Sequence, residues 1–244
     1  MKAMILAAGL GTRLRPLTDK CPKALVEIDG RTMLEITIRR LKQAGVNEVI
    51  VNAFHFAEMI VEYLRSHNHF GIRIEVSLED TLLDTGGGLK KVSHFFDDGT
   101  DLPFILHNVD VLSNIDLGRM MGAHKKHQAL ATLAVQHRET SRYLLFDQQL
   151  ELCGRRAANS EPEVIAGRYL AQELAFSGIH IISPRLLPML TEEGAFSIVT
   201  SYLRLAAEGE KIMAFRADDY YWRDLGKPES VAQAAQDLKQ NLIG

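Results

Sequence analysis

Short apolar runs alternate with amphipathic segments through the first half of the chain. The run at residues 3–7 (AMILA) is compact and passes into a glycine-containing loop, which is typical of a buried strand. Residues 32–44 carry apolar side chains at helical spacing and stop at Gly45, which predicts a helix. The same alternation predicts further strands at residues 48–52, 72–77, 103–107 and 131–136, and further helices at residues 57–65, 85–92 and 116–126.

Strands and helices in this order predict an α/β fold with a Rossmann-like, mostly parallel sheet flanked by helices on both faces. Ligands of such sheets bind beyond the carboxyl ends of the strands. Three segments follow strands in this way, and we therefore expect them to line one crevice. They are the loop that begins at Ala7, the Thr85-Gly86-Gly87-Gly88 stretch and Asp110.

The pattern changes after Gln136 and predicts a smaller β-rich lid. Residues 155–168 contain Asn, Ser, Pro and Gly and predict a loop. Strands are expected at residues 143–146, 150–153 and 173–182, and helices at residues 185–190, 197–207 and from Pro228 onward. The last helix is expected to carry Val231, Ala235, Leu238 and Leu242 on one face.

Composition indicates an ordinary globular protein, since 46% of the 244 residues are hydrophobic and 24% are charged. We interpret residues 1–244 as a single domain, with a first half of about residues 1–136 and a lid with closing helices of about residues 137–244. The formal net charge of −3 lacks the basic excess of proteins that bind nucleic acid. The two cysteines form no CxxC pair, which argues against a structural zinc site. Without a secretory signal or an apolar stretch of roughly 20 residues, we expect a cytoplasmic protein that does not bind membranes.

Residues 6–25 (LAAGLGTRLRPLTDKCPKAL) have the chemistry of a phosphate-binding loop. Gly9 and Gly11 let the backbone turn sharply, and free amides in such a loop form a concavity for anions. Arg13 offers a planar fork of donors to phosphate oxygens, and Lys23 adds a point charge suited to a second phosphate group. The simpler alternative is a tight turn with solvated arginines.

Two other phosphate motifs do not fit, because a dinucleotide fingerprint needs glycine where Leu14 stands and a Walker A loop needs Gly-Lys-Ser/Thr after the glycines. The loop instead strongly resembles the GxGTRxxPxT…PK hallmark of the sugar-nucleotide pyrophosphorylase family. The matching residues are Gly9, Gly11, Thr12, Arg13, Pro16, Thr18, Pro22 and Lys23.

This resemblance implies that Arg13 and Lys23 are catalytic residues: Arg13 holds a triphosphate and Lys23 contacts phosphate at the reacting centre. It also implies that the first half binds the nucleotide and the lid binds the sugar. The TGGG stretch is then expected beside the base, while the preceding Glu79 is expected to be a surface charge. The implied nucleotide-binding residues are Leu6, Ala8, Gly9, Gly11, Thr12, Arg13, Thr85, Gly86 and Asn108.

Two aspartates are candidate metal ligands. A single acid at a strand end, such as Asp110, is more often a helix cap or turn former, but Asp224 in the segment WRDLG supplies a second carboxylate. The resemblance implies that this pair holds Mg²⁺, a hard cation that accepts carboxylate oxygens. One departure is Val109, which stands where the family usually has glycine and is expected to narrow the approach to the metal.

The sugar contacts are less defined. Ser177 and Gly178 resemble the family's strand turn beside the sugar, although an ordinary glycine bulge is an equal alternative. The Glu-Lys-Pro run of many relatives is missing from residues 150–156 (LELCGRR). His107 and Asn108 are expected to touch ligand because they precede Asp110. A metal role is not expected for the histidines in polar helix ends, namely His67, His69, His124 and His127.

The function implied by the resemblance is Mg²⁺-dependent transfer of a nucleoside monophosphate from a nucleoside triphosphate to a sugar 1-phosphate, with release of pyrophosphate. The sequence shows no hexapeptide repeats, unlike the bifunctional acetyltransferase relatives. Its segments LLDTGGGL and FSGIHII are most similar to those of N-acetylmuramate 1-phosphate uridylyltransferases of cell-wall recycling, and this similarity favours UTP. We expect a monomer or small homo-oligomer.

Other functions stay open at this point. Mannose-1-phosphate guanylyltransferase and glucose-1-phosphate nucleotidyltransferase are alternatives within the family. A non-catalytic sugar-nucleotide-binding regulatory subunit is an alternative from another class. Transfer to phosphocholine is a third, and it would require an aromatic cage for the cation, for which Tyr220, Tyr221 and Trp222 are candidates.

Overall fold

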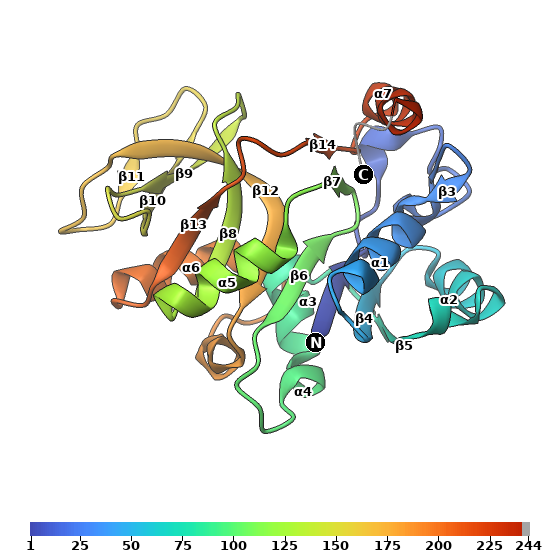
Figure 1. Ribbon diagram of the computed structural model, residues 1–244, viewed down its shortest axis with the longest axis horizontal. Coiled ribbons are helices and arrows are strands. Elements are labelled where there is room, and N and C mark those ends of the chain that lie inside the picture. The colour runs from blue at the N-terminus through green and yellow to red at the C-terminus, as the bar shows by residue number, and fades with distance from the viewer. Residues whose placement is uncertain (241–244) are drawn as a thin grey trace.

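The computed structural model describes residues 1–240 and contains one large sheet (Figure 1). Neighbouring strands pair in the order β11-β10-β9-β12-β6-β1-β4-β5. In addition, β8 pairs with β12, and β13 pairs with β8. The strands at one end, β6, β1, β4 and β5, run parallel to one another. Their bounds are Phe104–Asn108, Lys2–Leu6, Glu48–Ala53 and Arg73–Leu78, respectively.

Helices cover both faces of this parallel region, which confirms the predicted α/β fold (Figure 1). Ala3 and Ile5 of β1 pack in one core cluster with apolar residues of α1, α2 and α5, whereas Met4 packs in a second cluster with α3, α4 and α6. The alternation of side chains along a strand produces this division. The helices span Met33–Gln43 (α1), Ala57–Ser66 (α2), Asp84–Lys91 (α3), Ser93–Phe96 (α4), Leu117–His127 (α5) and Ile198–Ala207 (α6).

The lid is mainly antiparallel and is joined to the parallel region by one long strand. That strand, β12 (Gln172–Ile182), pairs antiparallel with β6, β8 and β9. Strand β13 pairs in parallel with β8. The other bounds in the lid are Ala131–Gln136 (β8), Arg142–Phe146 (β9), Leu152–Ala157 (β10), Glu163–Val164 (β11) and Ile212–Arg216 (β13).

Several lid elements differ from the sequence prediction. Residues 155–168 were expected to form a loop, but β10 continues to Ala157 and β11 follows it. Arg155 and Arg156 obscure the end of β10 in the sequence, because they give it no apolar alternation, and pairing with β9 and β11 extends the strand. Strand β13 had no predicted counterpart. The predicted helix at residues 185–190 is a 3-10 helix at Pro184–Met189, whose internal Pro188 has no amide proton for an α-helical hydrogen bond.

The final helix, α7 (Pro228–Lys239), begins at the predicted residue. Val231 is buried, and Ala235 and Leu238 are partly buried against the core, whereas Leu242 lies outside the described residues. Ala234 is also buried, so the packed face is rotated slightly from the predicted one. This helix packs against the small β2–β3 hairpin (Glu27–Ile28 and Arg31–Thr32) and against β14 (Trp222–Asp224).

Two histidines lie inside the sheet on neighbouring strands. His107 of β6 and His180 of β12 are 0% and 1% exposed. Burial lowers the pKa of His107 to about 4, and the charge of Arg40 acts in the same direction. Burial lowers the pKa of His180 to about 3, with a further contribution from His107. Both imidazoles are therefore neutral at neutral pH, and Nδ1 of His180 lies 2.8 Å from the Tyr202 hydroxyl.

We expect the free energy of unfolding to fall as the pH drops below about 6.5, where histidines of the unfolded chain take up protons. The folded His107 and His180 resist protonation down to about pH 4 and about pH 3. Their contribution to the free energy of unfolding is therefore complete above about pH 6.5. It decreases as the pH falls, by up to about 1.4 kcal/mol per pH unit for each histidine. Urea unfolding between about pH 7 and pH 5 measures this slope.

The matched variants are His180→Gln and His55→Gln, since His55 is exposed. His180→Gln should flatten the slope, and His55→Gln should leave it as in the wild type. Identical slopes in all three proteins would contradict the role of the buried histidines.

Candidate active site

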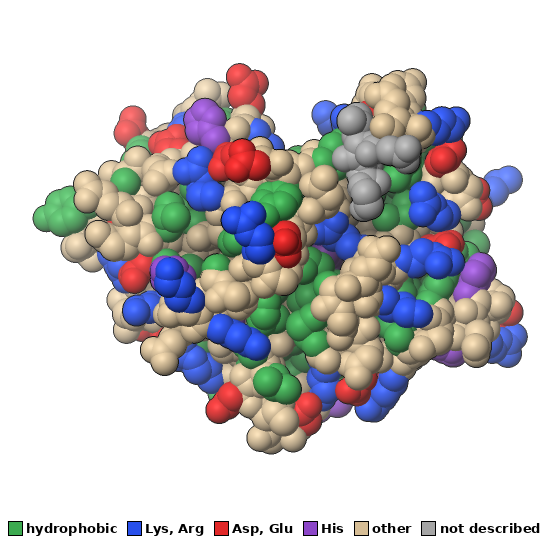
Figure 2. All heavy atoms as spheres, viewed as in Figure 1, with side chains coloured by type: hydrophobic (Ala, Val, Ile, Leu, Met, Phe, Trp, Pro, Cys, Tyr) green, Lys and Arg blue, Asp and Glu red, His purple; other side chains and the backbone are tan. Residues whose placement is uncertain are grey.

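Three segments meet at the carboxyl ends of the parallel strands, and the strand pattern of the sequence predicted the first two of them. They are the loop after β1, the residues after β6 and the segment of β14. In Figure 2 a hollow opens between the lid and α7, and Figure 1 places β7 (Val111–Ser113) and β14 at the same position. Four charged side chains meet in this crevice, those of Arg13, Lys23, Asp110 and Asp224.

The loop after β1 is held in one conformation by its own residues. Gly11 has a φ of 66°, and its carbonyl accepts hydrogen bonds from Leu14 N and Thr18 Oγ1, both at 2.8 Å. A Cβ atom on Gly11 would lie 2.9 Å from Thr18 Cγ2 and 3.1 Å from Lys23 Cβ, so glycine is required by both conformation and space. Leu14 is fully buried and anchors the loop, whereas Arg13 is exposed. The loop therefore presents Arg13 to the crevice from a fixed base.

A buried polar relay connects this loop to the start of α3. Asn52 Oδ1 accepts from Ala7 N at 2.7 Å, and Asn52 Nδ2 donates to Glu79 Oε1 at 2.7 Å. Glu79 Oε2 accepts from Leu83 N at 3.0 Å. The expectation that Glu79 is a surface charge is wrong, because this side chain is buried and bonded on both oxygens. Its partners on two other elements gave no signal in the sequence.

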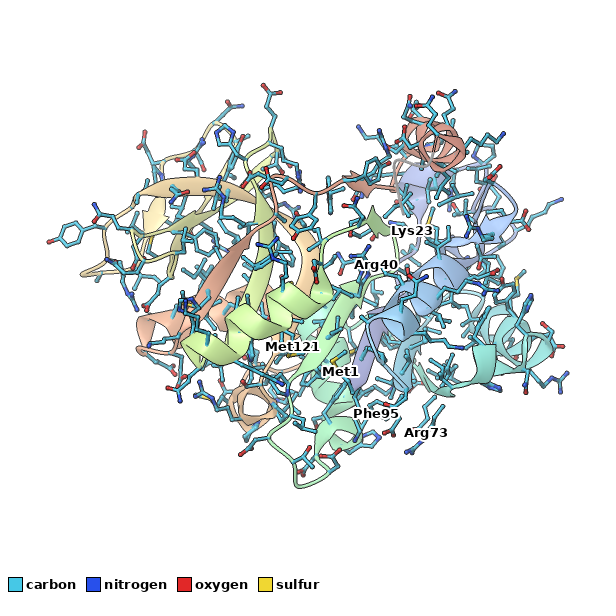
Figure 3. All side chains as sticks on the ribbon, viewed as in Figure 1. Met1, Lys23, Arg40, Arg73, Phe95 and Met121 are labelled. Atoms are coloured by element: carbon cyan, nitrogen blue, oxygen red, sulfur yellow. The ribbon has the colours of Figure 1, made fainter. Side chains whose placement is uncertain are left out.

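Lys23 and Asp110 form an ion pair in the crevice. Both side chains are mostly buried, with 12% and 14% exposure. Figure 3 places Lys23 beside β7, which follows Asp110 directly. An ion pair removed from water in this way is only weakly screened by salt, so Lys23 neutralises Asp110 before any substrate binds.

A two-stranded pairing brings Asp224 to the same place. Strand β7 (Val111–Ser113) pairs antiparallel with β14, and Val111 lies opposite Asp224. Leu225 N donates to the carbonyl of Asp110 at 2.8 Å. Asp224 Oδ1 accepts from Gly226 N at 2.9 Å. Arg13 reaches this point as well, since a Cβ atom on Gly226 would lie 2.8 Å from Arg13 Nη2.

The predicted obstruction by Val109 does not occur. Its side chain is buried in the core cluster shared with α1, and its amide donates to the carbonyl of Leu6 at 3.1 Å. The β-branched side chain therefore points away from the crevice, and the position before Asp110 tolerates it for that reason.

The glycines at the start of α3 are explained by packing within the protein. Gly86 donates its amide to the carbonyl of Phe196, and a Cβ atom there would collide with the Phe196 ring. A Cβ atom on Gly88 would lie 2.9 Å from Asn52 Nδ2. Thr85 Oγ1 accepts from Ile198 N at 3.0 Å. These contacts fix α3 against α6, and the assignment of Thr85 and Gly86 to the nucleotide stays a prediction.

The remaining predicted residues lie around the same crevice. Leu6 is the last residue of β1, and Ala8, Gly9 and Thr12 belong to the loop that follows it. Asn108 ends β6 and lines a cavity together with Thr85.

The predicted sugar residues lie on β12, which crosses both halves of the molecule. Ser177 is buried, and its hydroxyl has no hydrogen-bond partner among residues 1–240. Gly178 has a φ of 72°, and a Cβ atom there would lie 2.8 Å from Asn108 Nδ2. Gly178 therefore lets β12 pass close to Asn108.

Two histidine expectations need correction. His107 was expected to touch ligand, but it is completely buried, and its Nδ1 lies 2.7 Å from the Asn108 carbonyl. His124 was expected at a polar helix end, but it is buried, with its ring nitrogens 2.9 and 3.1 Å from hydroxyls of Thr132 and Ser183. Both side chains belong to the interior of the sheet and its helices.

The aromatic cage required by the phosphocholine alternative is not formed. The Arg138 guanidinium covers the Trp222 ring at 3.7 Å from its centroid, and Trp222 Nε1 donates to the Ser177 carbonyl at 2.8 Å. Tyr221 donates its hydroxyl to Asp237 at 2.5 Å. The contacts of Trp222 instead anchor the strand of Asp224 to the lid, since Arg138 also donates to the Phe176 carbonyl at 2.7 Å. The Tyr221 contact joins the same segment to α7.

Asp110 and Asp224 fit the requirements of Mg²⁺ when substrate phosphates complete the ligand set. Mg²⁺ in such sites is bound by one or two carboxylates together with phosphate oxygens and water. Within residues 1–240, no three His, Cys, Asp or Glu side chains are grouped so as to hold a metal without such help. Asp110 and Asp224, which the pairing of β7 with β14 brings together, thus match a metal site that substrate phosphates would complete.

Comparison with known proteins assigns the chain to a family. Residues 2–241 match the family described as Nucleotidyl transferase, and the chain belongs to this family. The UTP–glucose-1-phosphate uridylyltransferase of Synechocystis sp. is 28% identical over 256 residues, which cover 100% of this chain and 64% of the relative. Probable mannose-1-phosphate guanylyltransferase 1 of Oryza sativa subsp. japonica is 30% identical over 230 residues, which cover 93% and 62%. The chain thus spans less than two thirds of the length of these relatives.

Solved structures share the fold over nearly the whole chain. HddC from Yersinia pseudotuberculosis, complexed with GMP-PN, has a TM-score of 0.77 at 21% identity and covers 97% of this chain and 99% of its own. UDP-glucose pyrophosphorylase complexed with UDP-glucose has a TM-score of 0.81 at 17% identity and covers 98% of both chains. A search of the described helices finds none with the length and apolar character needed to cross a membrane.

We expect Arg13→Ala to weaken binding of a nucleoside triphosphate, because the loop presents this guanidinium to the crevice without an ion-pair partner among residues 1–240. Loss of charge-assisted hydrogen bonds should raise the Kd for UTP roughly 10- to 100-fold. Isothermal titration calorimetry measures the change.

The matched control is Arg15→Ala in the same loop. Arg15 is exposed and lies 3.5 Å from Asp19, so its removal should change the Kd by less than about twofold. Equal effects of the two substitutions would indicate that the loop binds phosphate through general charge and not through Arg13.

Proposed function

We propose that this protein transfers a nucleoside monophosphate from a nucleoside triphosphate to a sugar 1-phosphate and releases pyrophosphate. The observation that carries the proposal is the convergence of two cations, Arg13 and Lys23, with two carboxylates, Asp110 and Asp224. Cations alone would suit binding of any phosphate. The added carboxylate pair suits a reaction in which a divalent metal must approach the same phosphates.

The reaction joins two anions, so its main requirement is charge neutralisation. An oxygen of the sugar phosphate attacks the α-phosphorus, and the bond from that phosphorus to the bridging oxygen of the β-phosphate breaks. Arg13 would hold the triphosphate, and Lys23 would turn from Asp110 toward phosphate oxygens at the reacting centre. When bound, Mg²⁺ supplies neutralisation of the triphosphate and of the leaving pyrophosphate. The sugar phosphate is already ionised at neutral pH, so no general base is needed.

We favour UTP and N-acetylmuramate 1-phosphate as the substrates. The support is the resemblance of LLDTGGGL and FSGIHII to the corresponding uridylyltransferases. The relatives above are named for glucose 1-phosphate with UTP and for mannose 1-phosphate, so both sugars belong in any test. The non-catalytic regulatory alternative would be favoured by loss of a charged group from the crevice. The four charged residues of the crevice, Arg13, Lys23, Asp110 and Asp224, are all present.

The direct test is pyrophosphate release with Mg²⁺, in which UTP, GTP, CTP and dTTP are each combined with N-acetylmuramate, N-acetylglucosamine, glucose and mannose 1-phosphates. Release that requires one triphosphate and one sugar phosphate together would establish the reaction and identify both substrates. If the protein binds a nucleotide but releases no pyrophosphate with any pair, the regulatory alternative replaces the proposal.

We expect Asp224→Asn to reduce kcat by roughly two to three orders of magnitude, because it removes a negative charge from the proposed metal site. The fold should survive, since an asparagine oxygen can still accept the hydrogen bond from Gly226 N. Steady-state kinetics across a range of Mg²⁺ concentrations measures the effect.

The control for this variant is Asp219→Asn, which makes the same chemical change at an exposed position nearby. It should retain wild-type kcat. A near-normal rate for Asp224→Asn at saturating Mg²⁺ would remove Asp224 from the metal site.

A further inference from the structure

A cavity of about 490 Å³ lies between the inner face of the lid and the first turns of α3 and α6. Asn108 and Thr85 line one side of it, which places the cavity next to the crevice of Asp110. Arg142, Arg155 and Arg156 line the lid side. Its volume is in the range of pockets that enclose small ligands.

The strand register places two of these arginines on the same face of the lid. In the antiparallel pair of β9 and β10, Leu144 lies opposite Arg155, and Arg142 lies opposite Ala157. Alternate residues of a strand face the same side, and directly opposed residues do so as well. Arg142, Leu144 and Arg155 therefore share one face of the lid.

The arginines differ in how their charge is balanced. Arg155 pairs with Glu163 at 2.7 Å, and the neighbouring Arg156 pairs with Glu173. For Arg142, no ion pair or side-chain hydrogen bond is formed within residues 1–240. The acidic residue in the cavity wall is Asp84, whose Oδ1 accepts from Thr85 N at 2.6 Å. Arg142 thus faces the cavity with an unbalanced charge.

The opposite wall adds positive potential. It contains Ser197, which caps α6 by accepting from Val199 N at 3.3 Å, and the first residues of that helix. The N-terminus of a helix carries a partial positive charge. An unpaired guanidinium and a helix N-terminus across one cavity favour an anionic ligand group.

The position of Arg142 shows which part of a ligand it would meet. Strands β9 and β6 pair with the same edge of β12, one after the other, with Tyr143 opposite Ala175 and His107 opposite Ile179. Extended by one residue on each strand, this register puts Arg142 and Asn108 two residues, or roughly 7 Å, apart along β12. If phosphate reacts beside Asp110, a group at Arg142 belongs to the far side of a hexose, and not to the 1-phosphate.

We propose that Arg142 binds a carboxylate carried by the sugar ring, and so selects acidic sugar 1-phosphates over neutral ones. This inference rests on the proposed transferase function. One unpaired guanidinium balances one carboxylate and matches its planar oxygens, whereas a second phosphate group would leave excess negative charge. Leu144 and Phe176, also in the wall, offer apolar surface to the ring or its substituents.

The test compares two sugars that differ by one acidic substituent. N-Acetylmuramate 1-phosphate carries a lactyl ether with a carboxylate, and N-acetylglucosamine 1-phosphate has a hydroxyl in its place. The readout is the kcat/KM for N-acetylmuramate 1-phosphate divided by the kcat/KM for N-acetylglucosamine 1-phosphate. Arg142→Met should lower this ratio roughly 10- to 100-fold, mainly through KM for the acidic sugar. Arg142→Lys should restore part of it, because charge is regained without the planar fork.

Arg155→Met serves as the matched control on the same wall. Its charge is already balanced by Glu163, so the ratio should change much less than with Arg142→Met. Equal ratios in wild type and Arg142→Met overturn the inference, as does a wild-type preference for the neutral sugar. In either case turnover of a sugar phosphate leaves the proposed function standing. Absence of turnover with every pair would instead remove the proposed function. UTP binding by each variant shows that its fold is intact.

Discussion

The pairing of β7 with β14 is the constraint on which the candidate active site depends. It joins a segment directly after Asp110 to one near the end of the described chain, and it places Asp224 opposite Val111. A slip of one residue would turn the Asp224 side chain to the other face of the strand. The hydrogen bond from Leu225 N to the Asp110 carbonyl fixes the register, and the Arg138–Trp222 stack holds the strand from the lid side.

Charge balance within the crevice follows from this arrangement. Two carboxylates close together would repel one another in a partly buried site. The ion pair of Lys23 with Asp110 and the approach of Arg13 to Gly226, beside Asp224, offset that repulsion within the protein itself. The same cations are then available to phosphate groups. In the proposed function, Lys23 would exchange Asp110 for phosphate oxygens when substrate binds.

Much of the geometry is fixed by residues that need not touch a ligand. The Asn52–Glu79 relay connects the loop after β1 to the start of α3, and it is buried where an unbonded carboxylate would be costly. The glycines of α3 leave room for Phe196 and for Asn52. Precise placement of Arg13 and Lys23 therefore rests on hydrogen bonds and close packing behind them.

The sequence by itself determined the α/β class and the course of the parallel strands, and it predicted phosphate binding by the loop at Gly11, Arg13 and Lys23. These features are local: apolar periodicity reports strands and helices, and a short motif carries its own loop geometry. Only the tertiary structure decided that Glu79 and His107 are buried, that β10 continues to Ala157, that β13 is a strand, and that Trp222 is covered by Arg138. Each of these depends on partners distant in the chain, and local pattern does not record which distant segments will pair.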